Sequence, residues 1–319
     1  MGLLVTMLDD TTPPAADAAP ESVVVIGNFD GVHRGHQAVL AEAVLQAGPA
    51  ELSVVVLTFD PHPSAVVGGG APPMLTTLAR RAELLGNLDV ARVYVRRFDA
   101  AFATWSADRF VRDLVAATLR ARIVLVGDNF RFGARRGGDM TLLRALGAEL
   151  GFVAHVHKVV FDEAGAFSSS RVRRCVAAGD LDGVTLVLGR PHAITGTVVH
   201  GAKRGRTIGV PTANLDAIPE LLPPNGVYAV RTDLLQADGS VVGPLGPGVM
   251  NIGVRPTVGG DPSRSVEVFL LDWSGDIYGA TLRVHLVARL RDEQRFDGLD
   301  ALKAQIARDV DEARRLLGD

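Results

Sequence analysis

One change in hydrophobic periodicity along the chain limits the folds that it can adopt. Up to Gly189-Arg190-Pro191, short apolar runs alternate with stretches of helical periodicity, which is typical of parallel βαβ units. Beyond that tripeptide the helical period disappears, and strand-like segments follow one another with turn residues between them. A chain of 319 residues has room for about two domains. The sequence therefore predicts a flexible leader over 1–21, an α/β domain over 22–188 and a β-rich domain over 189–319.

The first of these domains is expected to be an open parallel sheet covered by helices. The expected strands are Val23–Gly27, Leu52–Phe59, Ala91–Val95, Ile123–Gly127 and Phe152–His157. The expected helices are Gln37–Gln46, Thr77–Leu88, Ala107–Leu119, Thr141–Leu150, Ser170–Ala178 and Leu181–Leu188. Ligands of such α/β folds bind at the carboxyl ends of the strands, so a ligand site is expected there.

The second domain is expected to be an antiparallel barrel, because closure of the sheet removes exposed strand edges. The expected strands are Ala193–Val199, Gly226–Thr232, Gly248–Val254, Ser265–Leu271 and Ala280–Val287. We expect residues 238–247, which contain Gly and Pro, to form a long connection between two of them. Residues 298–317 return to helical spacing and are expected to pack on the barrel.

Composition excludes several classes of protein. No apolar run reaches the roughly 18 residues that a membrane span requires. A net charge of −3 and an aromatic content of 5% argue against nucleic acid as a partner. Cys175 is the only cysteine, which excludes an intrachain disulfide, and no Lys or Arg precedes Arg34 as a secretory signal would require. We expect a cytoplasmic protein without a membrane partner, and a homo-oligomer remains open.

The first strand-to-helix turn carries the strongest chemical pattern, Gly27-Asn28-Phe29-Asp30-Gly31-Val32-His33-Arg34-Gly35-His36. The free N–H groups at a helix start attract phosphate, and glycine allows close approach of the backbone. Two imidazoles beside this turn can stabilise the charge that develops on phosphate oxygens. The alternatives are that His33 and His36 only cap the helix or bind zinc. His157, at the end of a later strand, is expected near the same site.

The chemistry-bearing segment of the second domain is His200–Asn214, which combines glycines, basic residues and the tetrad Pro-Thr-Ala-Asn. Strand alternation places Thr212 and Asn214 on one face of an extended segment. Their oxygens are suited to a hard cation such as Mg²⁺. The alternative is a turn whose polar side chains bond local backbone.

An acidic residue also interrupts an apolar strand in this domain. Glu267 lies within Ser265–Leu271, where an unpartnered buried carboxylate would be costly. Either it has a functional partner or it faces outward from the strand.

Taken together, these segments resemble a known family. Residues His33–His36 resemble the HxGH motif of nucleotidyltransferases. The whole segment Gly27–His36 resembles the corresponding motif of the bacterial bifunctional riboflavin kinase/FMN adenylyltransferase (FAD synthetase) family. Three further motifs follow in the same order, at Thr58–Pro63, Val126–Gly133 and Ser168–Arg173. The resemblance implies a Rossmann-like nucleotidyltransferase domain with a parallel sheet, followed by an antiparallel β-barrel with a terminal helix.

For the first domain the resemblance implies transfer of AMP from ATP to FMN, which gives FAD and pyrophosphate. His33 and His36 would act on the ATP phosphates. The other residues that this role would assign to ATP are Gly27, Asn28, Phe29, Asp30, Ser169, Ser170 and Arg171. Asn129 and Phe132 would bind the flavin. Without the family pattern, Phe132 would be read as a core residue and the serines as a helix cap.

For the second domain the resemblance implies phosphorylation of riboflavin to FMN by ATP. The residues assigned to ATP are Gly205, Arg206, Gly209, Pro211, Thr212 and Asn214. Thr212 and Asn214 would also hold Mg²⁺, Glu267 would accept the proton of the riboflavin 5′-hydroxyl, and Arg291 would contact the flavin. Two rivals remain open: an enzyme of the same fold that lacks adenylyl transfer, and a flavin-sensing or RNA-binding regulator that uses residues 203–206.

Overall fold

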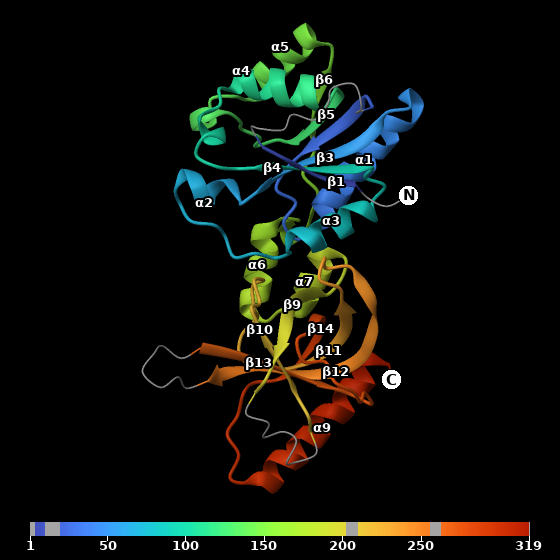
Figure 1. Ribbon diagram of the computed structural model, residues 1–319, viewed down its shortest axis with the longest axis vertical. Coiled ribbons are helices and arrows are strands. Elements are labelled where there is room, and N and C mark those ends of the chain that lie inside the picture. The colour runs from blue at the N-terminus through green and yellow to red at the C-terminus, as the bar shows by residue number, and fades with distance from the viewer. Residues whose placement is uncertain (1–3, 10–19, 202–209, 256–262, 319) are drawn as a thin grey trace. The chain divides into compact units, whose positions relative to one another are not determined.

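The computed structural model describes residues 4–9, 20–201, 210–255 and 263–318. By its internal contacts the chain divides into two compact units (Figure 1). The first consists of Met1–Pro72 and Arg80–Ser168, and the second of Pro73–Ala79 and Ser169–Asp319. Each unit has a core of its own, so each is described separately.

The first unit contains a six-stranded parallel sheet in the order β1-β4-β3-β2-β5-β6. Its strands are β1 (Leu4–Leu8), β2 (Ser22–Ile26), β3 (Ser53–Asp60), β4 (Arg92–Arg97), β5 (Ala121–Gly127) and β6 (Val153–His157). All residues of β2 are buried, as expected for a central strand covered on both faces. The predicted parallel α/β sheet is confirmed.

The prediction of a flexible leader is wrong for residues 4–8. These residues form β1, which pairs in parallel with β4 from Leu4 opposite Arg92 to Leu8 opposite Arg96. Leu8 is buried in the core of the unit. The remaining segment from residue 10 to residue 19 lies outside the described residues. A short edge strand has too few residues to show a clear alternation, which is why the sequence did not reveal it.

Helices connect these strands and close around the core. They are α1 (Arg34–Ala47), α2 (Pro63–Val67), α3 (Leu78–Gly86), α4 (Ala107–Arg109), the π-helix η3 (Phe110–Thr118) and α5 (Met140–Leu150), with short 3-10 turns at Gly48–Ala50, Phe102–Thr104 and Ala134–Arg136. A small hairpin follows β6, formed by β7 (Phe161–Asp162) and β8 (Gly165–Ala166). The predicted helix over 107–119 is therefore mostly a π-helix, a form that often occurs at functional sites.

The second unit contains a closed barrel in the order β10-β13-β12-β11-β14-β9, and every pairing is antiparallel. Its strands are β9 (His192–Val199), β10 (Ala213–Asp216), β11 (Gly226–Leu235), β12 (Val241–Arg255), β13 (Ser263–Leu270) and β14 (Thr281–Arg291). The predicted barrel is confirmed. The long connection predicted over 238–247 is wrong, because β12 already begins at Val241 and pairs with β11.

Strand alternation gives the barrel an apolar interior and a second apolar surface outside. Tyr228, Met250 and Val268 are fully buried in the interior cluster. Helix α9 (Leu299–Leu317) lies against the outer face, where its buried Ala313 and Leu317 pack near Ala229 (Figure 1). The barrel wall is therefore sandwiched between its own core and α9.

Two further helices, α6 (Ser169–Ala178) and α7 (Leu181–Leu188), belong to the barrel unit by their contacts. Leu181 of α7 is part of the barrel's core cluster, and α7 contacts β9 and β14. This places the boundary between the units at Ser168, whereas the change of periodicity in the sequence predicts it after Leu188. Periodicity identifies a segment as helix or strand, but only the contacts show in which core the segment is buried.

Candidate active sites

The turn after β2 is held in an unusual backbone conformation. Phe29 and Val32 have φ angles of 53° and 40°, a region that residues with a Cβ rarely adopt, and Gly31 has φ 84°. The Thr58 hydroxyl donates a hydrogen bond of 3.1 Å to the carbonyl of Asn28, which ties the turn to the neighbouring strand. Such conformations cluster at functional sites because the surrounding structure must enforce them.

The two histidines of the HxGH motif lie together at the start of α1. His33 is the N-cap, and its Nδ1 accepts a hydrogen bond from the backbone N–H of His36 at 3.3 Å. The two rings stack with centroids 3.6 Å apart. A Cβ on Gly35 would lie 2.9 Å from the carbonyl oxygen of Phe167 and 3.1 Å from the His33 ring. Only glycine allows the rings and the backbone to approach this closely.

A cavity of about 240 Å³ opens beside these rings. Gly27, Phe29, His33 and His36 line it, and so does Gly127 at the end of β5. His33 therefore caps the helix and also faces a cavity, so the two readings of the motif do not exclude each other. In the part of the chain that the structure describes, no group of three or more His, Cys, Asp or Glu residues is arranged to hold a metal ion.

Two residues of the same motif have structural partners instead. Asn28 Nδ2 lies 3.0 Å from His62 Nε2. Asp30 is buried, and its Oδ1 lies 3.8 Å from the guanidinium of Arg81. Neither Asn28 nor Asp30 is among the described residues that line the cavity. They stabilise the turn, and their contact with ATP stays a prediction.

His157 is a cavity residue that the motifs did not assign. It lies at the end of β6, opposite Gly127 of β5, and lines the same cavity as His33 and His36. Its Nδ1 is 2.5 Å from Glu42 Oε2 of α1, whereas its Nε2 is buried without a hydrogen-bond partner among the described residues. The carboxylate fixes the orientation of the ring, as outer partners of functional histidines commonly do.

The two predicted flavin residues of the first unit, Asn129 and Phe132, do not line the same cavity. Phe132 is buried, stacks on Phe130 with centroids 5.3 Å apart, and lines a small aromatic cavity of about 80 Å³. Trp105, in the same cavity, lies under the guanidinium of Arg109 at 3.7 Å. Asn129 is exposed and does not line this cavity in the described structure. Phe132 is thus both a core residue and a cavity residue.

Ser169, Ser170 and Arg171 lie in the first turn of α6, which belongs to the barrel unit. Arg171 is buried. The structure places all three at a helix start, as the sequence predicts, and their role toward pyrophosphate stays a prediction.

In the barrel, strand register gathers a row of side chains on one face. Asn214 of β10 pairs with Glu267 of β13, which pairs with Asn251 of β12. Asn251 pairs with Val227 of β11, which pairs with Arg291 of β14. Directly paired residues point to the same face of a sheet, so five strands present one continuous row. The row faces out of the barrel, because the alternate residues form the core.

A cavity of about 580 Å³ lies between this row and α9. Glu267, Asn251 and Arg291 line one side of it. The α9 side is formed by the residues Leu299, Leu302, Ile306 and Asp309. Glu267 does face outward, as the second reading of this residue predicts, but it faces a covered cavity rather than bulk solvent.

Thr212 connects this cavity to another. Its hydroxyl donates a hydrogen bond of 3.2 Å to Glu267 Oε2. It also lines a separate cavity of about 360 Å³, together with Pro211, Trp273 and Tyr278. A hydroxyl and a carboxylate therefore stand where two ligand-sized cavities meet.

Apart from Pro211 and Thr212, the residues of this segment that were predicted to bind ATP are not found lining either cavity in the described structure. Asn214 is buried beside Gly201, whose added Cβ would lie 2.2 Å from Asn214 Nδ2. Asn214 shares the row with Glu267 but lines neither cavity in the described structure. Gly205, Arg206 and Gly209 lie outside the described residues, so their roles stay predictions.

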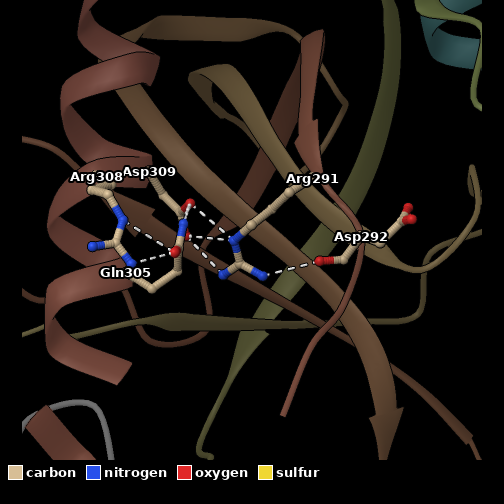
Figure 2. Close-up of polar contacts among 5 residues, drawn as sticks. All are labelled: Arg291, Asp292, Gln305, Arg308 and Asp309. Atoms are coloured by element: carbon tan, nitrogen blue, oxygen red, sulfur yellow. Dashed lines mark hydrogen bonds and ion pairs between the residues drawn. The ribbon is translucent and has the colours of Figure 1, made fainter. Parts of the chain in front are cut away.

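Arg291 lines the larger cavity, but most of its donors are used within the protein. Its Nε bonds both carboxylate oxygens of Asp309, at 2.9 and 3.1 Å, and its Nη2 bonds Asp309 Oδ2 at 2.8 Å. Its Nη1 donates to the carbonyl of Asp292 at 3.0 Å (Figure 2). The predicted flavin contact is therefore a cavity residue held in one orientation.

Sequence reasoning missed several residues of these cavities. Asn251 stands between buried Met250 and Ile252, so a polar residue in an apolar strand could have indicated it. Asp309 is also buried, but it lies in a helix with many charged residues, where nothing in the sequence singles it out.

Comparison with known proteins agrees with both halves of this description. The family model described as FAD synthetase matches residues 15–171, and the one described as riboflavin kinase matches residues 188–317. The chain is 43% identical over 297 residues to the bifunctional riboflavin kinase/FMN adenylyltransferase of Escherichia coli K12, and this match covers 93% of each chain. The chain belongs to this bifunctional family.

Two further relatives span nearly the whole chain. The family member from Pseudomonas fluorescens is 41% identical and covers 92% of each chain. The crystal structure of a macrolide-efflux protein from Streptococcus pneumoniae superposes with a TM-score of 0.83 at 29% identity, over 98% of this chain and 99% of that one. Within the described residues, every helix is too short or too polar to cross a membrane.

Proposed function

We propose that the chain makes FAD from riboflavin in two steps that use ATP, one step in each unit. The barrel unit phosphorylates riboflavin to FMN, and the parallel-sheet unit adenylylates FMN and releases pyrophosphate. One observation carries the assignment of the kinase site: Thr212 and Glu267 are hydrogen-bonded at the junction of two cavities. Phosphoryl transfer requires such a junction, because donor and acceptor must approach each other in line.

The larger cavity of the barrel is suited to riboflavin. Its volume of about 580 Å³ falls within the range of roughly 300–1,000 Å³ that is common for small-molecule sites. A flat ring system fits between the apolar residues of α9 and the outer wall of the barrel, where Val249 and Phe269 contribute. In our proposal the ribityl chain points toward Glu267, which orients the 5′-hydroxyl and accepts its proton.

The second cavity of the barrel is suited to ATP, with the phosphates at Thr212. The 5′-oxygen of riboflavin attacks the γ-phosphorus, the bond to the bridging oxygen of the β-phosphate breaks, and ADP leaves. Positioning contributes more than basicity to such a loose transition state. Trp273 and Tyr278 offer aromatic faces against which the adenine can lie.

The donor set at this junction fits Mg²⁺. Thr212 and Asn214 supply a hydroxyl and an amide oxygen, and Glu267 lies next to both, so hard oxygen ligands are close together. When bound there with ATP, the ion would neutralise charge on the transferred phosphoryl group. The chain's own residues orient the nucleotide and hold the hydroxyl proton.

In the parallel-sheet unit, the 240 Å³ cavity is suited to the ATP phosphates. A phosphate oxygen of FMN attacks the α-phosphorus of ATP, and the bond to the β-phosphate oxygen breaks to release pyrophosphate. His33 and His36 bond the oxygens on which charge develops, assisted by the N–H groups at the start of α1. No covalent intermediate with the protein is required.

The flavin of this second step is assigned to the aromatic cavity beside Phe132. Its volume of about 80 Å³ is well below that of an ordinary ligand site, so the aromatic rings must separate to admit FMN. Asn129 reaches the flavin only if the turn after β5 also moves. We further propose residues 22–188 and 189–319 as the two functional domains, with the edge strand β1 added to the first and with α6 and α7 packed on the barrel unit. We also propose a cytoplasmic location.

A paired assay tests this assignment. Riboflavin or FMN is supplied with ATP and Mg²⁺, and FMN, FAD and pyrophosphate are followed separately. We expect Glu267→Gln to lower FMN formation by about a hundredfold while supplied FMN is still adenylylated. We expect His36→Ala to lower FAD formation by about a hundredfold while FMN accumulates.

Wild-type protein that makes FMN but no FAD would support the rival enzyme with one activity. Saturable flavin binding without turnover of ATP would support the regulator. Loss of both reactions in either folded variant would contradict the assignment of residues to two sites.

A further inference from the structure

Asp309 of α9 is the buried central acceptor of a polar cluster that joins α9 to β14. Its side chain is 5% exposed. Its carboxylate accepts three hydrogen bonds from Arg291 and a fourth from Gln305 Nε2 at 2.8 Å (Figure 2). A bidentate guanidinium–carboxylate pair fixes orientation as well as distance. Arg291 is thereby joined to α9 across 18 residues of sequence.

This cluster lies at one end of the cavity wall. Leu299, Leu302, Ile306 and Asp309 all line the large cavity, and their helical spacing places them along one face of α9. The first three offer only apolar contact. Of these four residues of α9, Asp309 is therefore the one that joins the helix to the barrel strand β14, through its ion pair with Arg291.

The cavity offers Arg291 more than one carboxylate with which to pair. Among the described residues that line it, Arg291 is the single cation, whereas Glu267, Glu293 and Asp309 are acidic. Glu293 lies two residues beyond Arg291 and could pair with a released guanidinium. Of the three carboxylates, Asp309 is the one that pairs with this cation, whereas Glu267 and Glu293 accept hydrogen bonds from Thr212 and Asn225.

We infer that Asp309 is a positioning residue for riboflavin: it fixes both Arg291 and the α9 wall before the ring system enters. Preorganisation of this kind improves affinity, because the ligand does not have to order the wall. Arg291 then acts mainly as a strut between β14 and α9. The inference rests on the proposal that this cavity takes riboflavin.

The test compares Asp309→Asn with wild-type protein. The substitution keeps the shape of the side chain and removes its charge, so we expect the KM and Kd for riboflavin to rise about tenfold, the loss typical of a charged hydrogen bond. The kcat of the kinase and the KM for ATP should stay within about twofold. Asp309→Glu, which keeps the charge, should recover part of the loss. Adenylylation of supplied FMN by the same protein should not change.

A double-mutant cycle shows whether Arg291 acts through Asp309 or contacts riboflavin independently of it. If Arg291 acts through Asp309, the double variant Arg291→Lys/Asp309→Asn should bind riboflavin no more weakly than the worse single variant. Glu312→Gln is the matched control, because Glu312 forms an exposed ion pair with Arg315 on the same helix. It should leave riboflavin binding unchanged.

Several results would overturn the inference. An unchanged riboflavin Kd in Asp309→Asn, or multiplicative losses in the double variant, would show that the pair does not position the ligand. Equal losses of kcat in both reactions would indicate a general structural role. Failure of the wild-type protein to quench riboflavin fluorescence on binding would instead contradict the proposed function of the cavity.

Discussion

The two units build their sites in different ways. In the parallel-sheet unit, His33, Gly35 and His36 come from one turn, and tight backbone packing sets the distances between them. In the barrel, Glu267 and Arg291 come from strands far apart in sequence, and register brings them into one row. A site on a turn depends on local backbone contacts. A site on a barrel wall depends on pairing across the whole sheet.

This comparison predicts its largest effect at the turn. In Gly35→Ala, the new Cβ would lie 2.9 Å from the Phe167 carbonyl, which is backbone and cannot rotate away. We expect FAD formation to fall about a hundredfold, because even a displacement of about 1 Å at a catalytic group has a cost of that size. FMN formation should not change.

Steady-state rates of both reactions check this prediction. Gly48→Ala is the control at the other end of α1, since no atom lies within 4 Å of its added Cβ. Gly35→Ala with a normal rate of FAD formation would mean that the tight turn is not required for catalysis.

A glycine of the barrel should respond more weakly. A Cβ on Gly253 would lie 2.5 Å from Glu293 Oε1, but this is the end of a flexible side chain that can move aside. For Gly253→Ala we expect the riboflavin KM to rise about threefold with little change in kcat, which corresponds to under about 1 kcal/mol. Gly243→Ala on the same strand has open space around it and serves as the control. An effect as large as that of Gly35→Ala would remove the distinction between the two kinds of site.

How far the sequence predicts each site follows from the same difference. His33 and His36 could be identified because their motif is contiguous and begins where a strand ends. Thr212 and Glu267 could be named as candidates, but only the strand pairing brings them within 3.2 Å. Asn251 could have been suspected only as a polar residue in an apolar strand, because strand register brings it into the row. Asp309 could not be found, because its importance arises from helix packing. The edge strand β1 is too short to show a clear alternation, so only its pairing with β4 marks it as a strand.

The smallest expected effect concerns stability in the barrel unit. Burial raises the pKa of the Glu220 carboxyl above its ordinary value, although the Thr195 N–H donates to it at 3.0 Å. Because the folded state holds this proton more tightly than the unfolded state, the contribution to stability is full at low pH. It is lost as pH rises through the folded pKa.

Chemical unfolding of wild-type protein and Glu220→Gln from pH 4 to pH 8 measures this contribution. The variant should gain stability relative to wild type as pH rises. A constant difference between the two proteins across this range would mean that Glu220 does not change its protonation on unfolding.

The separation of two sites on one chain is tested most directly by mixing two variants, each of which lacks one of the two activities. Glu267→Gln and His36→Ala are incubated together with riboflavin, ATP and Mg²⁺, and FAD is followed over time. We predict that the mixture forms FAD after a lag, as FMN made by His36→Ala reaches the adenylylation site of Glu267→Gln, while each variant alone forms almost none. A mixture that stops at FMN, or that leaves riboflavin unconverted, with both proteins folded, would contradict the account.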